Sequence, residues 1–261
     1  MVKEKTEDAS GQTGDVIEVR DLRCGYGETT ILKDLRFSVR AGEIFLIAGP
    51  SGCGKSTLMR YLINLQTALA GEINVLGQRL GDYGDHWNRR FYRSIGVLFQ
   101  GGALWSSMSL LENVALPLRE HTTMPPPLAW EFARLKLRQV GLQGFESHTP
   151  REISGGMRKR VALARALVLD PKIVFLDEPS AGLDPPTSRQ LDQLILRIRE
   201  IFGTTVVVVS HEIASIRAIA DRVLLLDPKK KTAAGLGTLE ELLSDQGPSL
   251  AKEFFAGEEA D

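Results

Sequence analysis

The sequence predicts an α/β fold with a mainly parallel sheet. Several short runs are apolar at every position, which is typical of strands buried on both faces of a parallel sheet. Helical periodicity lies between these runs, notably from Thr187 to Ile201, and this alternation favours the α/β class. The expected buried strands are Ile44–Ala48, Ile95–Phe99, Ile173–Leu176, Thr205–Val209 and Val223–Leu226.

The amino-terminal region precedes this core and has a different pattern of polar and apolar residues. Residues 1–15 are polar and are expected to be a disordered tail. Val16–Arg20 and Leu35–Val39 are predicted to be short antiparallel strands, separated by a turn at Gly25-Tyr26-Gly27. The first buried strand then leads into a glycine-rich loop, and a helix is expected from about residue 54 to residue 64.

The pattern changes again after the second buried strand. The region of about residues 101–170 shows helical periodicity and no convincing strand, so we expect a helical subdomain inserted into the core. A break at Pro125-Pro126-Pro127 divides it. The whole domain is expected to span residues 16–240, with a carboxyl-terminal extension over residues 241–261. The helices expected in the insertion are Leu110–Leu118, Leu128–Val140 and Gly155–Leu169.

Composition restricts the class of partner. The net charge of -1 and the pI near 6.5 give no global reason to expect nucleic acid or an acidic membrane surface. Cys24 and Cys53 lie outside any metal-ligand spacing, which favours a reduced, intracellular compartment. No apolar run reaches the length of a membrane span, and the polar start lacks a signal-peptide core. Any work at a membrane would then need another chain to cross it.

The glycine-rich loop after the first buried strand has the pattern G-x-x-x-x-G-K-[ST]. Between a strand and a helix, this pattern binds phosphate: backbone N–H groups cradle the oxygens and the helix N-terminus adds a positive dipole. Lys55 is expected to reach the β- and γ-phosphates, and Ser56 to ligate Mg²⁺. Cys53 fills an unconstrained position and is not expected to take part in chemistry. The nucleotide-binding loop is Gly49-Pro50-Ser51-Gly52-Cys53-Gly54-Lys55-Ser56-Thr57.

Two carboxylates follow the buried strand that begins at Ile173. An apolar strand ending in Asp177 and Glu178 delivers both groups to the carboxyl edge of the sheet, where ligands bind in open α/β folds. Asp177 is expected to support Mg²⁺, and Glu178 to orient or deprotonate the attacking water. Taken alone, such a strand is often just capped by a solvated pair. The phosphate loop is what favours the catalytic interpretation, with ATP and Mg²⁺ as cofactors.

With these motifs the chain resembles the ATP-binding cassette (ABC) ATPases, which are P-loop NTPases, over about residues 16–240. Ser154-Gly155-Gly156 is similar to the family signature that follows the helical subdomain. Ser180-Ala181-Gly182-Leu183-Asp184, after the two carboxylates and Pro179, is similar to the family's D-loop. The motifs occur in the family's order and at its spacing.

The resemblance implies roles for three further residues. Gln100, which closes the second buried strand, matches the Q-loop glutamine and would contact Mg²⁺ and the attacking water. His211 matches the switch histidine and would contact the γ-phosphate. Tyr26 would stack on adenine. The sequence also allows purely structural roles for two of these residues. A histidine after a strand is often structural, and Tyr26 between two glycines could simply pack on a turn.

The resemblance also implies a head-to-tail homodimer that holds two ATP molecules between protomers. Each ATP would contact the phosphate loop of one chain and the signature and Asp184 of the other. Ser154 is suited to cap the following helix, whose N-terminal amides would face the γ-phosphate across the interface. Gly155 and Gly156 would permit close backbone approach.

Two passages resemble a narrower group, the ATPase subunits of Mce/Mla-type lipid transporters. They are "FQGGALWSSMSLLENVALPL" and "ISGGMRKRVALARAL", and the carboxyl-terminal "GTLEELLSDQGPSLAKEFFAG" is similar too. Ile153 and Met157 depart from the usual leucine and glutamine of the wider family. The resemblance implies a subunit that powers a membrane permease moving phospholipid or related hydrophobic molecules. It would lie at the cytoplasmic face of the inner membrane, held there by the permease, with an Mce-domain carrier and a STAS-domain subunit as further partners.

Several alternatives stay open. The chain could be the ATPase of another importer, of a lipoprotein-release complex or of a cell-division complex. A cassette acting on nucleic acid is disfavoured by the near-neutral charge, and a binding module without turnover by the presence of Glu178. Trp105 and its apolar neighbours are expected in the subdomain core or in a groove for a partner helix. The carboxyl-terminal extension packs on its own core or on a neighbouring protomer, and Arg158, Lys159, Arg160 and Arg165 are expected mostly on a solvated face.

Overall fold

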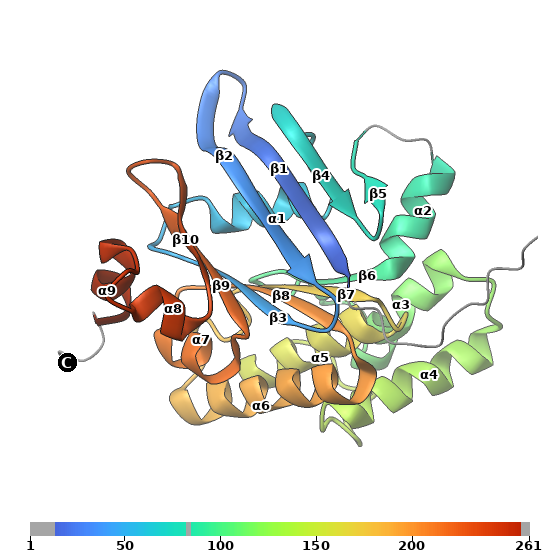
Figure 1. The fold of residues 1–261 in the computed structure, drawn as a ribbon. Helices are drawn as coiled ribbons and strands as arrows, with labels where there is room; N and C mark the ends of the chain where they lie inside the picture. The colour runs from blue at the N-terminus through green and yellow to red at the C-terminus, as the bar shows by residue number, and fades with distance from the viewer. Residues whose placement is uncertain (1–13, 82–84, 257–261) are drawn as a thin grey trace, which may run out of the picture.

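The computed structural model describes residues 14–81 and 85–256, with side chains 85–88 excepted. Its amino-terminal part is an antiparallel sheet that lies over a second, larger sheet (Figure 1). The strand order of the upper sheet is β2-β1-β4-β5. Asp15 already belongs to the first strand, while the predicted disorder of residues 1–13 lies outside the described residues. The strands are β1 (Asp15–Tyr26), β2 (Thr29–Arg40), β4 (Ala70–Val75) and β5 (Gln78–Arg79).

The larger sheet has the strand order β10-β9-β3-β8-β7-β6. Neighbours from β9 to β6 pair in parallel, and only β10 is antiparallel to its neighbour. The mainly parallel α/β fold predicted from the sequence is therefore confirmed. The strands are β3 (Ile44–Ala48), β6 (Ile95–Leu98), β7 (Ile173–Asp177), β8 (Thr205–Ser210), β9 (Arg222–Asp227) and β10 (Thr232–Gly237).

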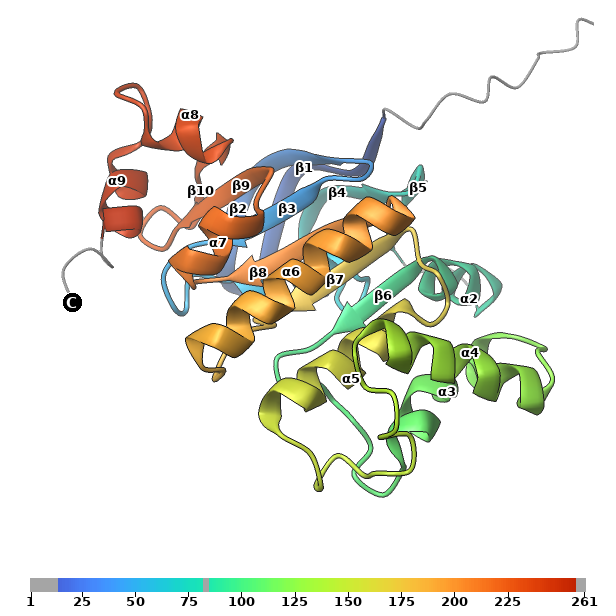
Figure 2. The same ribbon diagram turned by 90° about the horizontal axis from the view of Figure 1, so that it is seen from below.

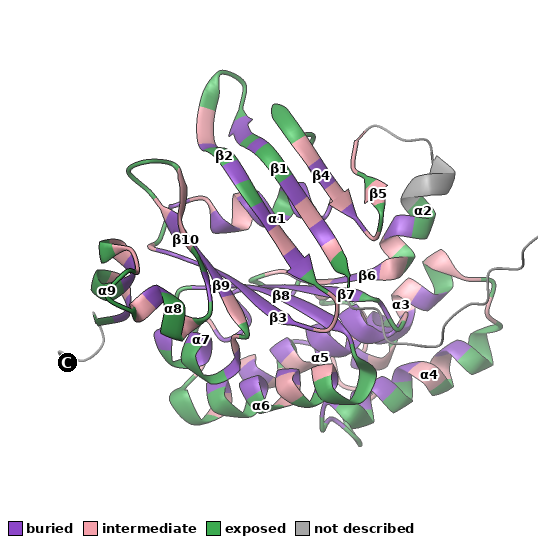
Figure 3. Ribbon diagram, in the orientation of Figure 1, coloured by how far each residue is buried: buried purple, intermediate pink, exposed green. Residues whose placement is uncertain are grey.

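Side chains of the parallel strands alternate between two hydrophobic cores. Phe45 and Ile47 of β3 face the antiparallel sheet, whereas Ile44 and Leu46 face the helices on the opposite side. Because successive strand side chains point to opposite faces, a strand with a core on each side must be apolar throughout. The central strands are accordingly buried along their length (Figure 3).

Helices fill the space between the sheets and cover the outer face of the larger one. Helix α1 (Lys55–Leu62) contributes Leu58 and Leu62 to the core between the two sheets. Helix α6 crosses beneath the larger sheet, with α7 beside it (Figure 2). The remaining helices of the core and the extension are α2 (Asp85–Ser94), α6 (Pro185–Phe202), α7 (Ile213–Ile219), α8 (Leu239–Leu243) and α9 (Ser249–Ala256).

The insertion predicted at about residues 101–170 contains helices α3 (Leu110–His121), α4 (Pro126–Gln139) and α5 (Gly155–Leu167), which share a third core. Ser109 begins α3 with a capping box, in which its hydroxyl accepts from the Glu112 N–H and the Glu112 carboxylate accepts from the Ser109 N–H. The triple-proline break does not separate two elements as a loop. It begins α4, because a proline in the first turn loses no helical hydrogen bond.

The carboxyl-terminal extension packs against its own chain. Ala251 and Phe255 of α9 are buried in the core beneath the larger sheet, and Arg217 of α7 donates to the Phe255 carbonyl. Packing on its own core, one of the two open alternatives, is therefore observed for these residues. Across the described ranges, no helix combines the length and apolar character that a bilayer span requires.

Candidate nucleotide-binding site

The phosphate loop connects β3 to α1. The φ angle of Gly54, directly before the helix, is 103°, in a region that favours glycine. A Cβ atom there would also lie 2.9 Å from Ile31, so both conformation and space require glycine. The Lys55 ammonium donates to the carbonyls of Gly49 at 2.8 Å and Pro50 at 3.1 Å. These bonds hold the lysine, which is only 6% exposed, across the concave side of its own loop.

Strand register brings the other predicted groups to the same edge of the sheet. Ala48 pairs with Ser210, and Asp177 pairs with Val209. The residues that follow these strand ends therefore emerge side by side. Ser56 of α1 donates a hydrogen bond from its hydroxyl to the Asp177 carboxylate at 2.8 Å, so these two predicted metal ligands lie together.

Glu178 is the most constrained residue of the site. Its φ angle of 48° is left-handed, which is uncommon for a residue other than glycine and costs about 1–3 kcal/mol. Its N–H donates to the Val209 carbonyl at 2.9 Å, and its Oε1 lies 2.8 Å from His211 Nδ1 and 4.0 Å from the Lys55 ammonium. Its Oε2 is buried and has no hydrogen-bond partner among the described residues. A buried carboxylate oxygen of this kind is able to accept a hydrogen bond from a bound molecule.

An open pocket of about 350 Å³ joins these residues. The predicted Gln100 lines it together with the phosphate loop, and Ile31 contributes an apolar surface that the sequence did not reveal. A cavity whose donors come from a helix N-terminus, a loop and a lysine is suited to polyphosphate. The residues that line it are Ile31, Ser51, Gly52, Gly54, Lys55, Ser56, Thr57, Gln100, Glu178 and His211.

Tyr26 lies at the margin of the site and does not line this pocket. Its ring is 46% exposed at the end of β1, and its hydroxyl accepts a hydrogen bond from Arg60 of α1 at 3.2 Å. An exposed aromatic ring beside the first helix of a phosphate loop offers a surface on which a planar base could stack.

The predicted signature residues lie elsewhere. Ser154 begins α5, and its hydroxyl accepts from the Met157 N–H at 3.2 Å, as expected of a helix cap. Asp184 caps α6 in the same way through Thr187, whose methyl group would lie 2.5 Å from a Cβ atom added at Gly156. The signature and the D-loop thus form a second cluster, which contributes none of the described residues that line the nucleotide pocket.

Comparison with known proteins decides the family. The model of the ABC transporter family matches residues 32–181, a span that holds the phosphate loop, Gln100, the signature and both carboxylates. The chain belongs to the ABC transporter family. As an ABC ATPase it binds ATP and hydrolyses it, and in this family hydrolysis is coupled to transport.

The relatives of this cassette include two named groups. The intermembrane phospholipid transport system ATP-binding protein MlaF of Haemophilus influenzae is 38% identical over 94% of this chain and 91% of its own length. Its namesake in Escherichia coli K12 is 38% identical over 85% of this chain and 82% of its own. The probable ribonucleotide transport ATP-binding protein mkl of Mycobacterium leprae is 39% identical over 94% of this chain and 70% of its own.

Solved cassettes share the fold. A dimeric ATP-binding cassette in a post-hydrolysis state, bound to ADP and phosphate, has a TM-score of 0.77 at 30% identity and covers 85% of this chain and 98% of its own. A cassette from Clostridium perfringens, part of an ABC transporter complex, has a TM-score of 0.80 at 26% identity and covers 89% and 92%. The antiparallel amino-terminal sheet and the mainly parallel sheet are therefore those of an ABC cassette.

The donor set of the cassette is compatible with Mg²⁺. No group of three or more His, Cys, Asp or Glu side chains that could hold a metal lies in the described part of the chain. Magnesium does not require one, because it usually keeps several waters and binds one or two carboxylates together with substrate phosphates. The Ser56 hydroxyl beside the Asp177 carboxylate is a donor set of that kind.

The basic run after the signature differs from its expected solvated face in two residues. Lys159 is 8% exposed, and its ammonium donates to the carbonyls of Gln100 and Glu178. Arg165 donates to the carbonyls of Gly102 and Ala103 at 2.7 Å. The sequence pattern misses the buried Lys159 and the half-buried Arg165 because both depend on contacts with loops far away in the chain, whereas Arg158 remains exposed as expected.

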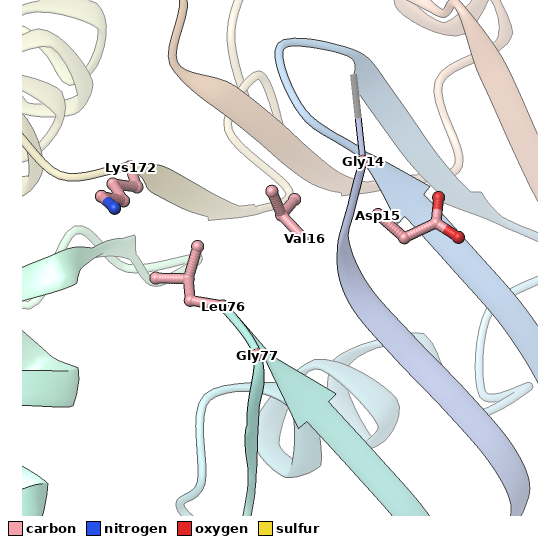
Figure 4. Close-up of a pocket in the computed structure, with 6 residues that line it drawn as sticks. All are labelled: Gly14, Asp15, Val16, Leu76, Gly77 and Lys172. Atoms are coloured by element: carbon pink, nitrogen blue, oxygen red, sulfur yellow. The ribbon is translucent and has the colours of Figure 1, made fainter. Parts of the chain in front are cut away.

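A second cavity, of about 240 Å³, lies at the opposite edge of the larger sheet (Figure 4). Lys172 on its wall directly precedes β7, whereas the carboxylates follow that strand. Val16 and Leu76 face it from the antiparallel sheet. Because ligands of open α/β sheets bind at the carboxyl ends of the strands, this cavity is not the nucleotide site.

Proposed function

We propose that this cassette is the Mg-ATP-driven subunit of a transporter that moves phospholipid or a related hydrophobic substrate between membranes. The observation that carries the proposal is the 38% identity to a phospholipid transport ATPase over 94% of this chain. The likeness includes nearly the full length of that relative, 91%, so it is not confined to the nucleotide motifs that all cassettes share.

Within the site, Glu178 is the proposed general base for the attacking water. His211 holds Glu178 Oε1 at 2.8 Å, which leaves the orphaned Oε2 to accept a proton from water. Lys55 and the loop amides stabilise charge on the β- and γ-phosphates. Ser56, Asp177 and the Gln100 side chain would hold Mg²⁺, which screens phosphate charge when it is bound.

The working unit is proposed to be a head-to-tail dimer with ATP between protomers. Among the residues that the structure describes, the phosphate loop and the signature cluster of one chain do not line a common pocket, so a nucleotide that contacts both would need them from different chains. Dimeric cassettes among the solved structures support this arrangement. Ser154, Gly155, Gly156 and Asp184 are then the residues that complete the partner's site.

A permease is the proposed membrane partner, and the helical subdomain offers a surface for it. The Asn113 side chain accepts from the Trp105 N–H at 2.8 Å and donates to the carbonyls of Trp105 and Ser109. These hydrogen bonds from buried Asn113 hold the backbone of Trp105, which follows the Gln100 loop in the chain and is 57% exposed. A hollow of about 540 Å³ lined by Leu111 and Trp130 lies on the same subdomain. An exposed aromatic anchor and a hollow on the same subdomain suit a short partner helix.

The proposed location of the cassette is the cytoplasmic face of the inner membrane, held there by the permease. An Mce-domain lipid carrier and a STAS-domain subunit are the further proposed partners, by resemblance to Mce/Mla-type assemblies. No nucleic-acid partner is proposed, because the net charge of -1 offers no basic field for a polyanion.

The test is to isolate the cassette from its native membranes and to identify what accompanies it. We expect the tagged chain to retain a multispanning permease and bound phospholipid. ATP should then drive transfer of a fluorescent phospholipid when that complex is reconstituted in vesicles. Trp105→Ala should release the permease, whereas Ile201→Ala, which removes a 70% exposed side chain from α6, should not. Recovery of a permease that carries no lipid and transfers none would refute the lipid assignment.

A second candidate is ribonucleotide transport, because the mycobacterial relatives named for it are 39–40% identical. The same reconstituted complex distinguishes the two candidates. ATP-dependent accumulation of a labelled ribonucleotide without phospholipid transfer would favour the second. The importers, lipoprotein-release complexes and cell-division complexes left open by the sequence would each be recognised by their own co-purifying membrane subunits.

A further inference from the structure

Lys159 is a buried lysine whose place the nucleotide site does not explain. It lies in the first turns of α5, five residues after the signature serine, and is 8% exposed. A buried ammonium is costly unless its donors are satisfied. Burial lowers the pKa of Lys159, while the nearby carboxylates of Asp177, Glu178 and Glu212 act in the opposite direction. The Lys159 ammonium therefore lies close to the carboxylates at the carboxyl end of β7.

The ammonium contacts two backbone carbonyls, and each belongs to a residue of the nucleotide pocket. One is the carbonyl of Gln100, in the loop after β6, and the other is that of Glu178, at 3.0 Å. Both residues line the pocket. Lys159 itself belongs to the helical subdomain, so one side chain joins three segments that are far apart in sequence.

The contact at Glu178 falls on a strained peptide. The left-handed backbone of Glu178 is held on its N–H side by the Val209 carbonyl of β8. On its carbonyl side it accepts from Lys159 at 3.0 Å and from the Ala181 N–H at 3.3 Å. A left-handed residue other than glycine persists only where the surroundings impose it. Lys159 supplies the charged hydrogen bond of that set, and charged hydrogen bonds are roughly twice as strong as neutral ones.

We propose that Lys159 is a positioning residue for ATP hydrolysis, which fixes the Glu178 carboxylate relative to Gln100 and transmits any tilt of the signature helix to both. The inference rests on the proposed role of Glu178 as general base. Lys159 is not among the described residues that line the pocket, so it acts through the two carbonyls it binds. Because a misplacement of 1 Å can cost about 100-fold in rate, loss of this contact should lower kcat far more than it lowers nucleotide affinity.

The test compares two buried lysines of the same subdomain. Lys136 is 4% exposed and forms an ion pair with Asp170, remote from the pocket, so Lys136→Met is a matched control for Lys159→Met. Both variants lose a buried ammonium and some stability. We expect Lys159→Met to lower kcat about 10- to 100-fold with the KM for ATP unchanged within about threefold, and Lys136→Met to leave both constants near wild type.

A conservative variant and a thermal scan separate positioning from folding. Lys159→Arg keeps a charged donor and should restore most of kcat at a Tm no higher than that of Lys159→Met. Lys159→Gln keeps a neutral donor and gives a second, better tolerated variant, with an intermediate kcat. If Lys159→Met or Lys159→Gln had the same kcat as the Lys136→Met control, compared at the same folded fraction, the proposal would be overturned. Separately, wild-type turnover in Glu178→Gln would overturn the role of Glu178 rather than that of Lys159.

Discussion

At the scale of single residues, the site depends on atoms held by more than one neighbour. Glu178 is fixed by Val209, His211 and Lys159, and one of its carboxylate oxygens has no hydrogen-bond partner in the described part of the chain. The sequence predicted Ser56, Asp177 and Glu178 because their motifs dictate their chemistry locally. It missed the burial of Lys159, since a lysine in a basic helical turn is usually solvated and only the packing of α5 against two distant loops removes it from water.

The first prediction separates binding from chemistry at the pocket. Glu178→Gln removes the proposed base but keeps the shape of the side chain, so ATP binding should persist while turnover falls by at least about 100-fold. Lys55→Ala removes the ammonium that spans the loop carbonyls, so affinity itself should fall. Equilibrium binding of a fluorescent ATP analogue and phosphate release measure the two effects. Retained turnover in Glu178→Gln would exclude the residue as the base.

At the scale of elements, the strands that the sequence revealed are those with a core on each face. Ile44–Ala48 and Thr205–Ser210 are apolar throughout because they cannot present a polar face to solvent. Ala70–Val75 and Thr232–Gly237 escaped notice because each contains glycine and few β-branched residues. Their strand conformation comes from pairing with β1 and β9 rather than from local preference.

Helices α6 and α7 meet through a buried polar network that gives a prediction about pH. Asp192 of α6 is 5% exposed and accepts from the Ser215 hydroxyl of α7 at 2.9 Å, and Ser215 also contacts Ser188. Burial raises the pKa of Asp192, the hydrogen bond from Ser215 lowers it, and the Glu212 carboxylate raises it further. The folded state therefore binds this proton more tightly than the unfolded chain does.

The sign of the pH effect follows from that difference. Asp192 imposes no charge penalty below its unfolded pKa, and the penalty develops as pH rises through its raised folded value. Asp192→Asn should therefore raise Tm by about 2–4 °C at neutral pH, and the gain should shrink on acidification towards pH 4. Glu200→Gln, on the exposed side of α6, should leave Tm unchanged. Differential scanning calorimetry across pH measures this, and a less stable Asp192→Asn at pH 8 would contradict it.

At the scale of the whole molecule, the residues predicted for one nucleotide site occupy two separate places. The phosphate loop, Gln100, Glu178 and His211 share a pocket, whereas the signature cluster gathers at the starts of α5 and α6. Local motifs allowed each half to be predicted from the sequence. Their separation could not be read from the motifs alone, because it depends on how the helical subdomain is set against the sheets (Figure 2).

Mixing two inactive variants tests whether one ATP site is built from two chains. Lys55→Ala damages the phosphate loop but leaves a sound signature. Gly155→Asp places a carboxylate where a γ-phosphate would face α5, and the fold should tolerate it because an added Cβ atom meets nothing closer than 3.7 Å. In a head-to-tail heterodimer both defects fall in the same site, and the other site is intact. With random pairing and independent sites, an equimolar mixture should therefore recover about one quarter of wild-type turnover, although each variant alone is nearly inactive.

If each chain built its whole site alone, the mixture would show only the mean of the two variants. Phosphate release before and after mixing distinguishes the two outcomes. Mixing Lys55→Ala with Glu178→Gln is the control. Each site of that heterodimer keeps one defect in its own pocket, so no activity should return.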